Sequence, residues 1–74
     1  MERMTVNIEA INPRRFIKQW PNMPTSLIPQ IGDKLVVNFG DDNEVKYEYK
    51  VVYREIDGKN TDVIFVHVDF WHDD

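Results

Sequence analysis

Alternation of apolar and polar residues in the second half of the chain constrains the fold more than any other feature. From Val45 to Tyr53 every second residue is apolar or aromatic, and the run from Ile64 to Phe70 repeats the pattern. A β-strand turns successive side chains to opposite faces of a sheet, so a period of two is typical of a strand buried on one face. The sequence therefore predicts an antiparallel β protein.

Compact polar segments separate the predicted strands. Residues 40–43 (Gly-Asp-Asp-Asn) and 57–60 (Asp-Gly-Lys-Asn) tolerate the positive φ angles of tight turns. They join three strands into a meander that covers about residues 34–71. The long middle strand changes phase at Val51-Val52, and this change predicts a β-bulge there.

The first half of the chain contributes one strand and a long connection. Alternation predicts the first strand at about residues 5–10, and Asn12-Pro13 ends it. Phe16 and Trp20 then follow at i, i+4, which favours one or two helical turns within a helix or loop segment at 12–33.

Residues 1–74 form a single domain in this interpretation, with a polar tail at 72–74. We expect a mainly β fold, either a small SH3-like, partly open barrel or a four-stranded antiparallel sheet. Coiling is favoured because one flat sheet of four strands leaves a thin core and two edges. The alternative is an α+β fold with the helix at 16–20 packed on one face of the sheet.

Composition narrows the class of protein. The chain has no cysteine, which excludes a disulfide or a Cys-based metal site. No apolar run approaches the ~20 residues that span a bilayer, and the first residues lack the apolar stretch of a signal peptide. We expect a soluble, cytoplasmic protein with no membrane association.

The net charge is −4, with +2 on residues 1–39 and −6 on residues 40–74, so general binding of nucleic acid is not expected.

Three segments of the chain resemble small bacterial and phage-encoded β proteins of the SH3-like barrel type that have no assigned activity. The segments are Pro29–Leu35, Tyr49–Tyr53 and Val66–Phe70, and the likeness covers about residues 28–70. Its most recognisable part is the Pro-x-Ile-Gly-Asp entry into a strand. The resemblance implies a fold and a role as an accessory factor of a phage or mobile element, but it carries over no functional residue.

Patterns for catalysis are missing from the sequence. There is no Cys nucleophile and no Gly-rich phosphate loop, and no sequence cue pairs Ser26, the only serine, with a base. We therefore expect a non-enzymatic protein without a cofactor.

Apolar residues on the second face of the last strand predict a protein-binding surface. Val63, Phe65 and Trp71 remain after the alternate residues enter the core, and exposed aromatics in a patch mark interfaces. The last strand is also expected at a sheet edge, open to another protein or to a second copy of the chain as a homodimer. We predict Phe65, Trp71, Val63 and Trp20 as partner-binding residues. The alternative is that the segment at 16–20 covers this face.

Two other functions stay open. A nucleic-acid-binding barrel would use a basic loop of three residues against phosphates: Arg14, Arg15 and Lys18. A divalent-metal site would use imidazole and carboxylate ligands near the end of the chain: His67, Asp69 and His72.

Overall fold

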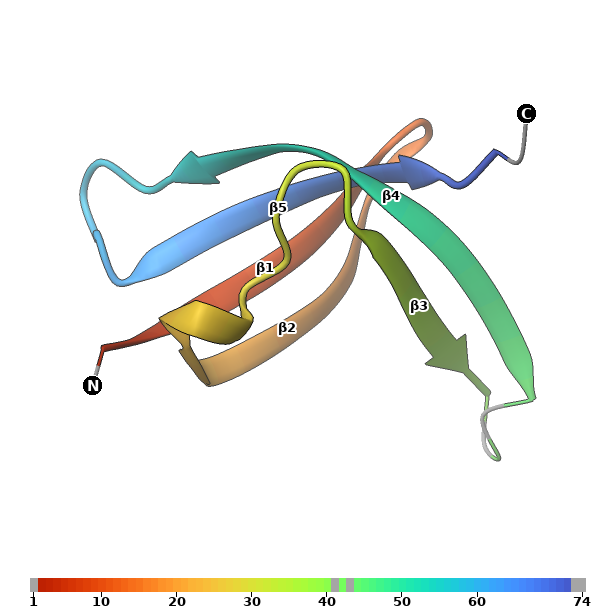
Figure 1. Cartoon of the computed structure of the whole chain (residues 1–74), viewed down its shortest axis with the longest axis horizontal. Coiled ribbons are helices and arrows are strands. Elements are labelled where there is room, and N and C mark those ends of the chain that lie inside the picture. The colour runs from red at the N-terminus through yellow and green to blue at the C-terminus, as the bar shows by residue number, and fades with distance from the viewer. Residues whose placement is uncertain (1, 41, 43, 73–74) are drawn as a thin grey trace.

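The computed structural model describes residues 2–40, 42 and 44–72, which form one five-stranded sheet curled into a half-barrel (Figure 1). The strands are β1 (Arg3–Ile11), β2 (Arg14–Pro24), β3 (Lys34–Phe39), β4 (Val45–Ile56) and β5 (Val63–Phe70), and η1 (Thr25–Leu27) is a single 3-10 turn. The mainly β class is confirmed, and the shape is consistent with a small SH3-like, partly open barrel.

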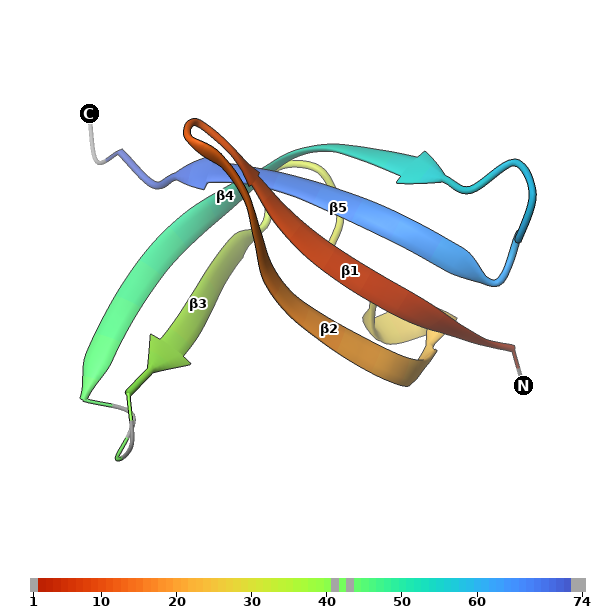
Figure 2. The same ribbon diagram turned by 180° about the vertical axis from the view of Figure 1, so that it is seen from behind.

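The strand order is β2-β1-β5-β4-β3. β1 and β2 form an antiparallel hairpin, β3, β4 and β5 form the predicted meander, and β5 joins the two units by pairing in parallel with β1. The last strand therefore lies in the middle of the sheet, and the prediction that it is an open edge is wrong. The edges are β2 and β3, which diverge from the crossing point of the sheet (Figure 2).

The predicted helix at 16–20 is also wrong, as is the α+β alternative, because these residues belong to β2. Lys18 lies opposite Ile8 in the hairpin, whereas Phe16 lies opposite Glu9, and a register shift separates the two pairs. This irregularity turns Phe16 and Trp20 to opposite faces, although they are four residues apart. The i, i+4 spacing of Phe16 and Trp20 therefore does not place the two rings on one side, as a helix would.

The predicted bulge in the long strand is confirmed by a register shift between Val51 and Tyr53. Before the shift Val51 lies opposite Val68, on the buried concave face of the sheet. After it Tyr53 lies opposite His67, on the convex face. The bulge thus lets one twelve-residue strand turn aromatic side chains to the core at one end and to the outer surface at the other.

The core lies on the concave face. Five of its side chains have no exposed surface: Val6, Ile8, Val51, Val66 and Val68. The connection from β2 to β3 covers them with Ile28 and Pro29, which are both buried. The connection is fixed to β4 because the Gly32 N–H donates to the Val51 carbonyl at 2.9 Å and the Val51 N–H donates to the Asp33 carbonyl at 3.0 Å.

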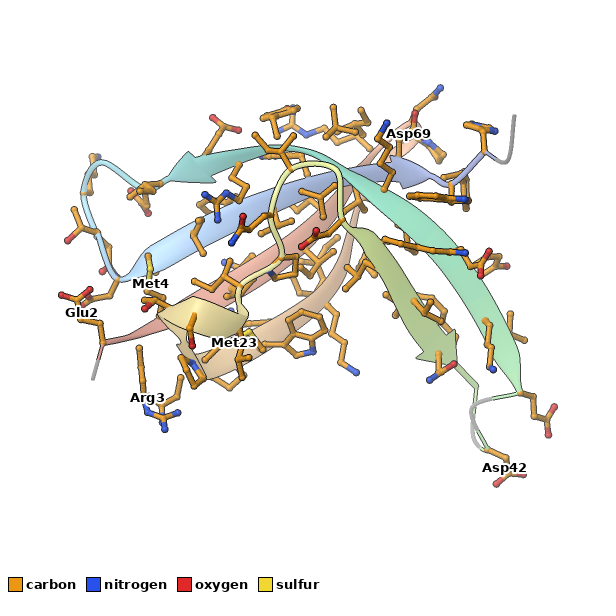
Figure 3. The ribbon with its side chains drawn as sticks, in the orientation of Figure 1. Glu2, Arg3, Met4, Met23, Asp42 and Asp69 are labelled. Atoms are coloured by element: carbon orange, nitrogen blue, oxygen red, sulfur yellow. The ribbon has the colours of Figure 1, made fainter. Side chains whose placement is uncertain are left out.

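The positions of the two hairpins bear on the candidate site. Asp42 marks the projecting tip of the β3–β4 hairpin, far from the paired Met4 and Met23 on the β1–β2 hairpin (Figure 3). Part of the concave face near the β3–β4 hairpin is uncovered, because Val45, Tyr47 and Phe70 there are each more than two-fifths exposed. Within the described residues, no helix has the length and apolar character needed to cross a membrane.

We expect Ile8→Ala to lower the free energy of unfolding by about 2–5 kcal/mol, because it opens a cavity in a fully buried site. Ile31→Ala is the matched control, since Ile31 is 65% exposed, and it should change stability by less than about 0.5 kcal/mol. Urea unfolding of both variants measures the difference. Equal losses would contradict the placement of the core.

Candidate interaction surface

Acidic residues are divided unevenly between the two faces of the sheet. All the acidic residues within the five strands lie on the convex face, as their cross-strand partners do: Glu9, Glu48, Glu55 and Asp69. The concave face of the strands holds three cations instead, Arg15 opposite Ala10, Lys18 opposite Ile8, and Arg54 opposite Val66. The concave face of the strands is therefore basic, although the net charge of the chain is negative.

Four rings from three strands meet on this concave face and form the aromatic cluster: Phe39 on β3, Tyr47 and Tyr49 on β4, and Phe70 on β5. Tyr47 is central, with ring centroids 5.4 Å from Phe39 and 6.1 Å from Phe70, both in edge-to-face geometry. Phe70 stacks on Tyr49 at 5.3 Å. Such contacts hold the rings in defined orientations and stabilise each pair by about 0.5–1.5 kcal/mol beyond burial.

The aromatic cluster is buried at one end and exposed at the other. Tyr49 is only 1% exposed, whereas Tyr47 and Phe70 are 41% and 43% exposed. The connection that covers the core pairs with β4 at Val51, so it does not extend over the rings nearer the β3–β4 turn. The outer rings therefore offer an apolar surface that rests on the core.

Tyr49 links the aromatic cluster to the opposite edge strand. Burial raises the pKa of its hydroxyl, while the charge of Arg15 and a hydrogen bond with the Arg15 side chain act in the opposite direction. Arg15 comes from β2, and so this contact spans the concave face from one edge strand to β4. It places a guanidinium beside the rings.

The partner-binding residues predicted from the sequence do not form one patch. Val63 and Phe65 are half-buried on the convex face, opposite Thr5 and Asn7. Trp20 lies on the concave face opposite Val6 and packs against the core. The segment at 16–20 therefore does not cover Phe65.

Trp71 is separate from the other predicted partner-binding residues. It follows the end of β5 and lies six residues beyond Phe65, roughly 20 Å in an extended chain. Its N–H donates to the Glu48 carbonyl at 2.9 Å, and its ring lies under the Lys34 ammonium, 5.1 Å from Nζ to the ring centroid.

The basic residues proposed for nucleic acid lie on an edge strand rather than in a loop. Strand alternation turns Arg14 to the convex face, opposite Ile11, and Arg15 and Lys18 to the concave face. The predicted basic loop is therefore wrong, but two of its three cations share a face with the aromatic cluster.

The residues proposed for a metal are not brought together. His67 Nε2 lies 2.7 Å from Glu55 Oε1, and Asp69 Oδ1 accepts a hydrogen bond from the Phe70 N–H at 2.9 Å. Over residues 2–40, 42 and 44–72, no three His, Asp or Glu side chains gather closely enough to hold a metal ion.

His67 instead anchors a cluster on the convex face. Its ring is only 6% exposed and stacks on Tyr53 with centroids 4.3 Å apart. The Glu55 carboxylate covers Nε2 but lies off the N–H direction, so the short contact is not a well-aligned hydrogen bond. A hollow of about 250 Å³ adjoins this group, lined by Glu9, Arg14, Glu55, Phe65 and His67.

Sequence reasoning missed the exposed part of the aromatic cluster. Tyr47 and Phe70 were assigned to the buried set because both follow the apolar alternation of their strands. Alternation shows which face a residue occupies, but it does not show how far the cover over that face extends. The useful signal was the shortness of the apolar connection at 27–31, which supplies too few side chains to cover both ends of a twelve-residue strand.

The raised pKa of Tyr49 predicts a loss of stability at alkaline pH. The unfolded chain releases the tyrosine proton at about pH 10, whereas the folded protein retains it to higher pH. The stabilisation is therefore complete below that value and is lost as the pH rises through the folded pKa. Tyr49→Phe should remove this component. Urea unfolding of both proteins from pH 8 to 11 measures it, and a constant difference across that range would contradict the prediction.

We expect Glu55→Ala to lower the free energy of unfolding by up to about 1 kcal/mol, because the carboxylate 2.7 Å from His67 Nε2 no longer covers this edge of the buried ring. Glu48→Ala is the control, since Glu48 pairs with Lys34 at 3.1 Å between two well-exposed side chains and should cost less. Histidine NMR spectra give a second measurement: the His67 ring signals should move in the first variant only. Unchanged signals in Glu55→Ala would refute the contact.

Comparison with known proteins adds no assignment to this geometry. No protein-family model matches the sequence, and neither a curated protein nor a solved structure matches the chain.

Proposed function

We propose that this protein is a non-enzymatic protein-interaction module that binds its partner through the aromatic cluster. The observation that carries the proposal is the mutual contact of Tyr47 with Phe39 and Phe70 on an uncovered face, with Tyr47 and Phe70 each more than two-fifths exposed. Rings already held in place lose little conformational freedom when a partner covers them, and aromatic residues dominate the energetics of protein interfaces.

The position of the aromatic cluster also supports this function. It occupies the end of the concave face next to β3, an edge strand whose outer side has no partner strand. A partner can therefore contact apolar rings and backbone hydrogen-bonding groups together, as in many peptide-recognition domains. The resemblance to phage-encoded proteins suggests an accessory role in the cytoplasm of an infected bacterium.

A second candidate function is binding of single-stranded nucleic acid by the same face. It is favoured by one observation: Arg15 and Lys18 lie on the concave face together with the aromatic cluster. Bases stack on aromatic rings and phosphates pair with cations in proteins of this kind. The net charge of −4 acts against it.

We expect Tyr47→Ala to abolish capture of the natural partner while the protein stays folded, because the central ring of the cluster is removed. Tagged wild-type and variant proteins would be incubated with lysate of the host, and retained proteins identified by mass spectrometry. Hot-spot aromatics cost at least about 2 kcal/mol on truncation, which lowers affinity roughly thirtyfold.

Phe16→Ala is the matched control, since Phe16 is an aromatic residue that is 59% exposed on the convex face. It should retain every specific partner. Loss of the same proteins from both variants, or from neither, would refute the aromatic cluster as the binding surface. Capture of nucleic acid instead of protein, removed by nuclease, would support the second candidate.

A further inference from the structure

The hollow of about 250 Å³ on the convex face adjoins a buried imidazole that lacks a well-aligned hydrogen bond. The imidazole belongs to His67, which is 6% exposed. Its stacking on Tyr53, with ring centroids 4.3 Å apart, fixes the plane of the ring. Buried polar atoms in proteins normally have a hydrogen-bond partner, and one that has none calls for a water, an ion or a ligand. The Nε2 atom of His67 is therefore a candidate ligand contact.

Two carboxylates share this hollow with the imidazole. Glu55 comes from β4, and its Oε1 atom lies 2.7 Å from His67 Nε2, so this edge of the ring is at the wall of the hollow. Glu9 comes from β1, lies opposite His67 in the parallel pair, and is half-buried. Within the described part of the chain, Glu9 forms no ion pair. The hollow thus offers acceptors from three adjacent strands, because a neutral imidazole accepts a hydrogen bond at one ring nitrogen.

The charges that line the hollow leave one negative charge in excess. Glu9 and Glu55 carry two negative charges, and Arg14, an exposed residue of β2, supplies one positive charge. A monovalent cation balances this set. The acceptors do not gather closely enough for a metal ion, whose bonds are about 2.0–2.2 Å long, but a hydrogen-bonding cation reaches further, with bonds of about 2.7–3.2 Å.

The shape of the cation follows from the same lining. An ammonium group has three N–H donors, which matches the number of acceptors. The remaining wall is apolar, since Phe65 lines the hollow and is half-buried. A ligand that fits therefore has an ammonium head and a short apolar chain.

We propose that the hollow binds a primary alkylammonium group, with its N–H donors on Glu9, Glu55 and His67 Nε2 and its alkyl chain on Phe65. The site lies on the face of the sheet opposite the aromatic cluster, and it goes beyond the proposed function. The same chemistry is found in a free amine and in the lysine side chain of another polypeptide.

The probe is n-butylammonium chloride, titrated into the full ¹⁵N-labelled protein at neutral pH and followed by NMR. Phosphate buffer is used because Tris is itself a primary amine. The probe should saturate at roughly millimolar concentration, as expected for a ligand of five non-hydrogen atoms. It should shift the His67 ring signals and the amides of Glu9 and Phe65. n-Butanol, which has the same chain and no charge, should bind at least about tenfold more weakly.

Three charge variants locate the site. Glu9→Gln should weaken binding about tenfold, because an anionic acceptor becomes a neutral one. Glu48→Gln is the matched control, since it removes the same charge from the convex face at a residue that pairs with Lys34 outside the hollow. It should change the affinity less than about twofold, because salt screens distant exposed charges. Arg14→Gln should strengthen binding about two- to fivefold, because it removes a neighbouring cation.

Nα-acetyl-lysine N-methylamide separates the two sources of the ammonium group. Binding at least as tight as that of n-butylammonium would identify the occupant as a lysine side chain, whereas weaker binding with the same shifts would identify a free amine. Three outcomes would overturn the proposal: no saturable shift, equal binding of the amine and the alcohol, or equal weakening in Glu9→Gln and Glu48→Gln.

Discussion

The constraint on which this structure depends is that one sheet must bury its own apolar face. The part of this 74-residue chain that the structure describes contains no α-helix, and so provides no second layer to pack against the sheet. Curling turns the apolar residues of both edge strands to one core, so that Trp20 of β2 and Leu35 of β3 pack against the same buried cluster. The connection at 25–33 completes the cover with Ile28 and Pro29. Burial on this scale helps a domain so small, which has no cysteine and so no disulfide, to fold.

Curling also has a consequence for function, since a sheet that stops short of a closed barrel keeps two edges and one uncovered end. The aromatic cluster lies at that end because β4 extends beyond the point where the connection pairs with Val51. Its inner ring, Tyr49, belongs to the core, and its outer rings, Tyr47 and Phe70, are exposed. In the proposed function, one continuous set of side chains thus supplies both stability and recognition.

Much of the fold could be predicted from the sequence, because period-two alternation is a local property. It placed the meander, the first strand and the bulge at Val51-Val52. It could not place β5 in the middle of the sheet, because parallel pairing of Val6 with Ile64 joins residues 58 positions apart and leaves no local signal. The prediction of a helix at 16–20 was wrong for a related reason. A bulge opposite Ile8 and Glu9 lets Ile17 and Trp20, three residues apart, both pack against the core, a spacing that also suits a helix.

The site was harder to predict than the fold because it depends on what covers a face and what borders an edge. Phe65 and Trp71 look like leftover aromatics in the sequence, yet one lines a hollow beside His67 and the other lies under Lys34. The acidic composition suggested that the meander would repel anions. Strand alternation instead sends all four strand carboxylates to the convex face and leaves Arg15 and Lys18 without acidic neighbours in the strands of the concave one.

Net charge is therefore a poor guide to what a curled sheet binds. The binding property belongs to one face, and the partition of charge between faces follows from register. A one-residue slip of β4 against β5 would turn Tyr47 outward and would bring Lys46, Glu48 and Lys50 inward, which would remove the aromatic surface. The bulge at Val51 confines its change of phase to the far half of β4, where Glu55 meets His67. The near half keeps the register that the interaction surface requires.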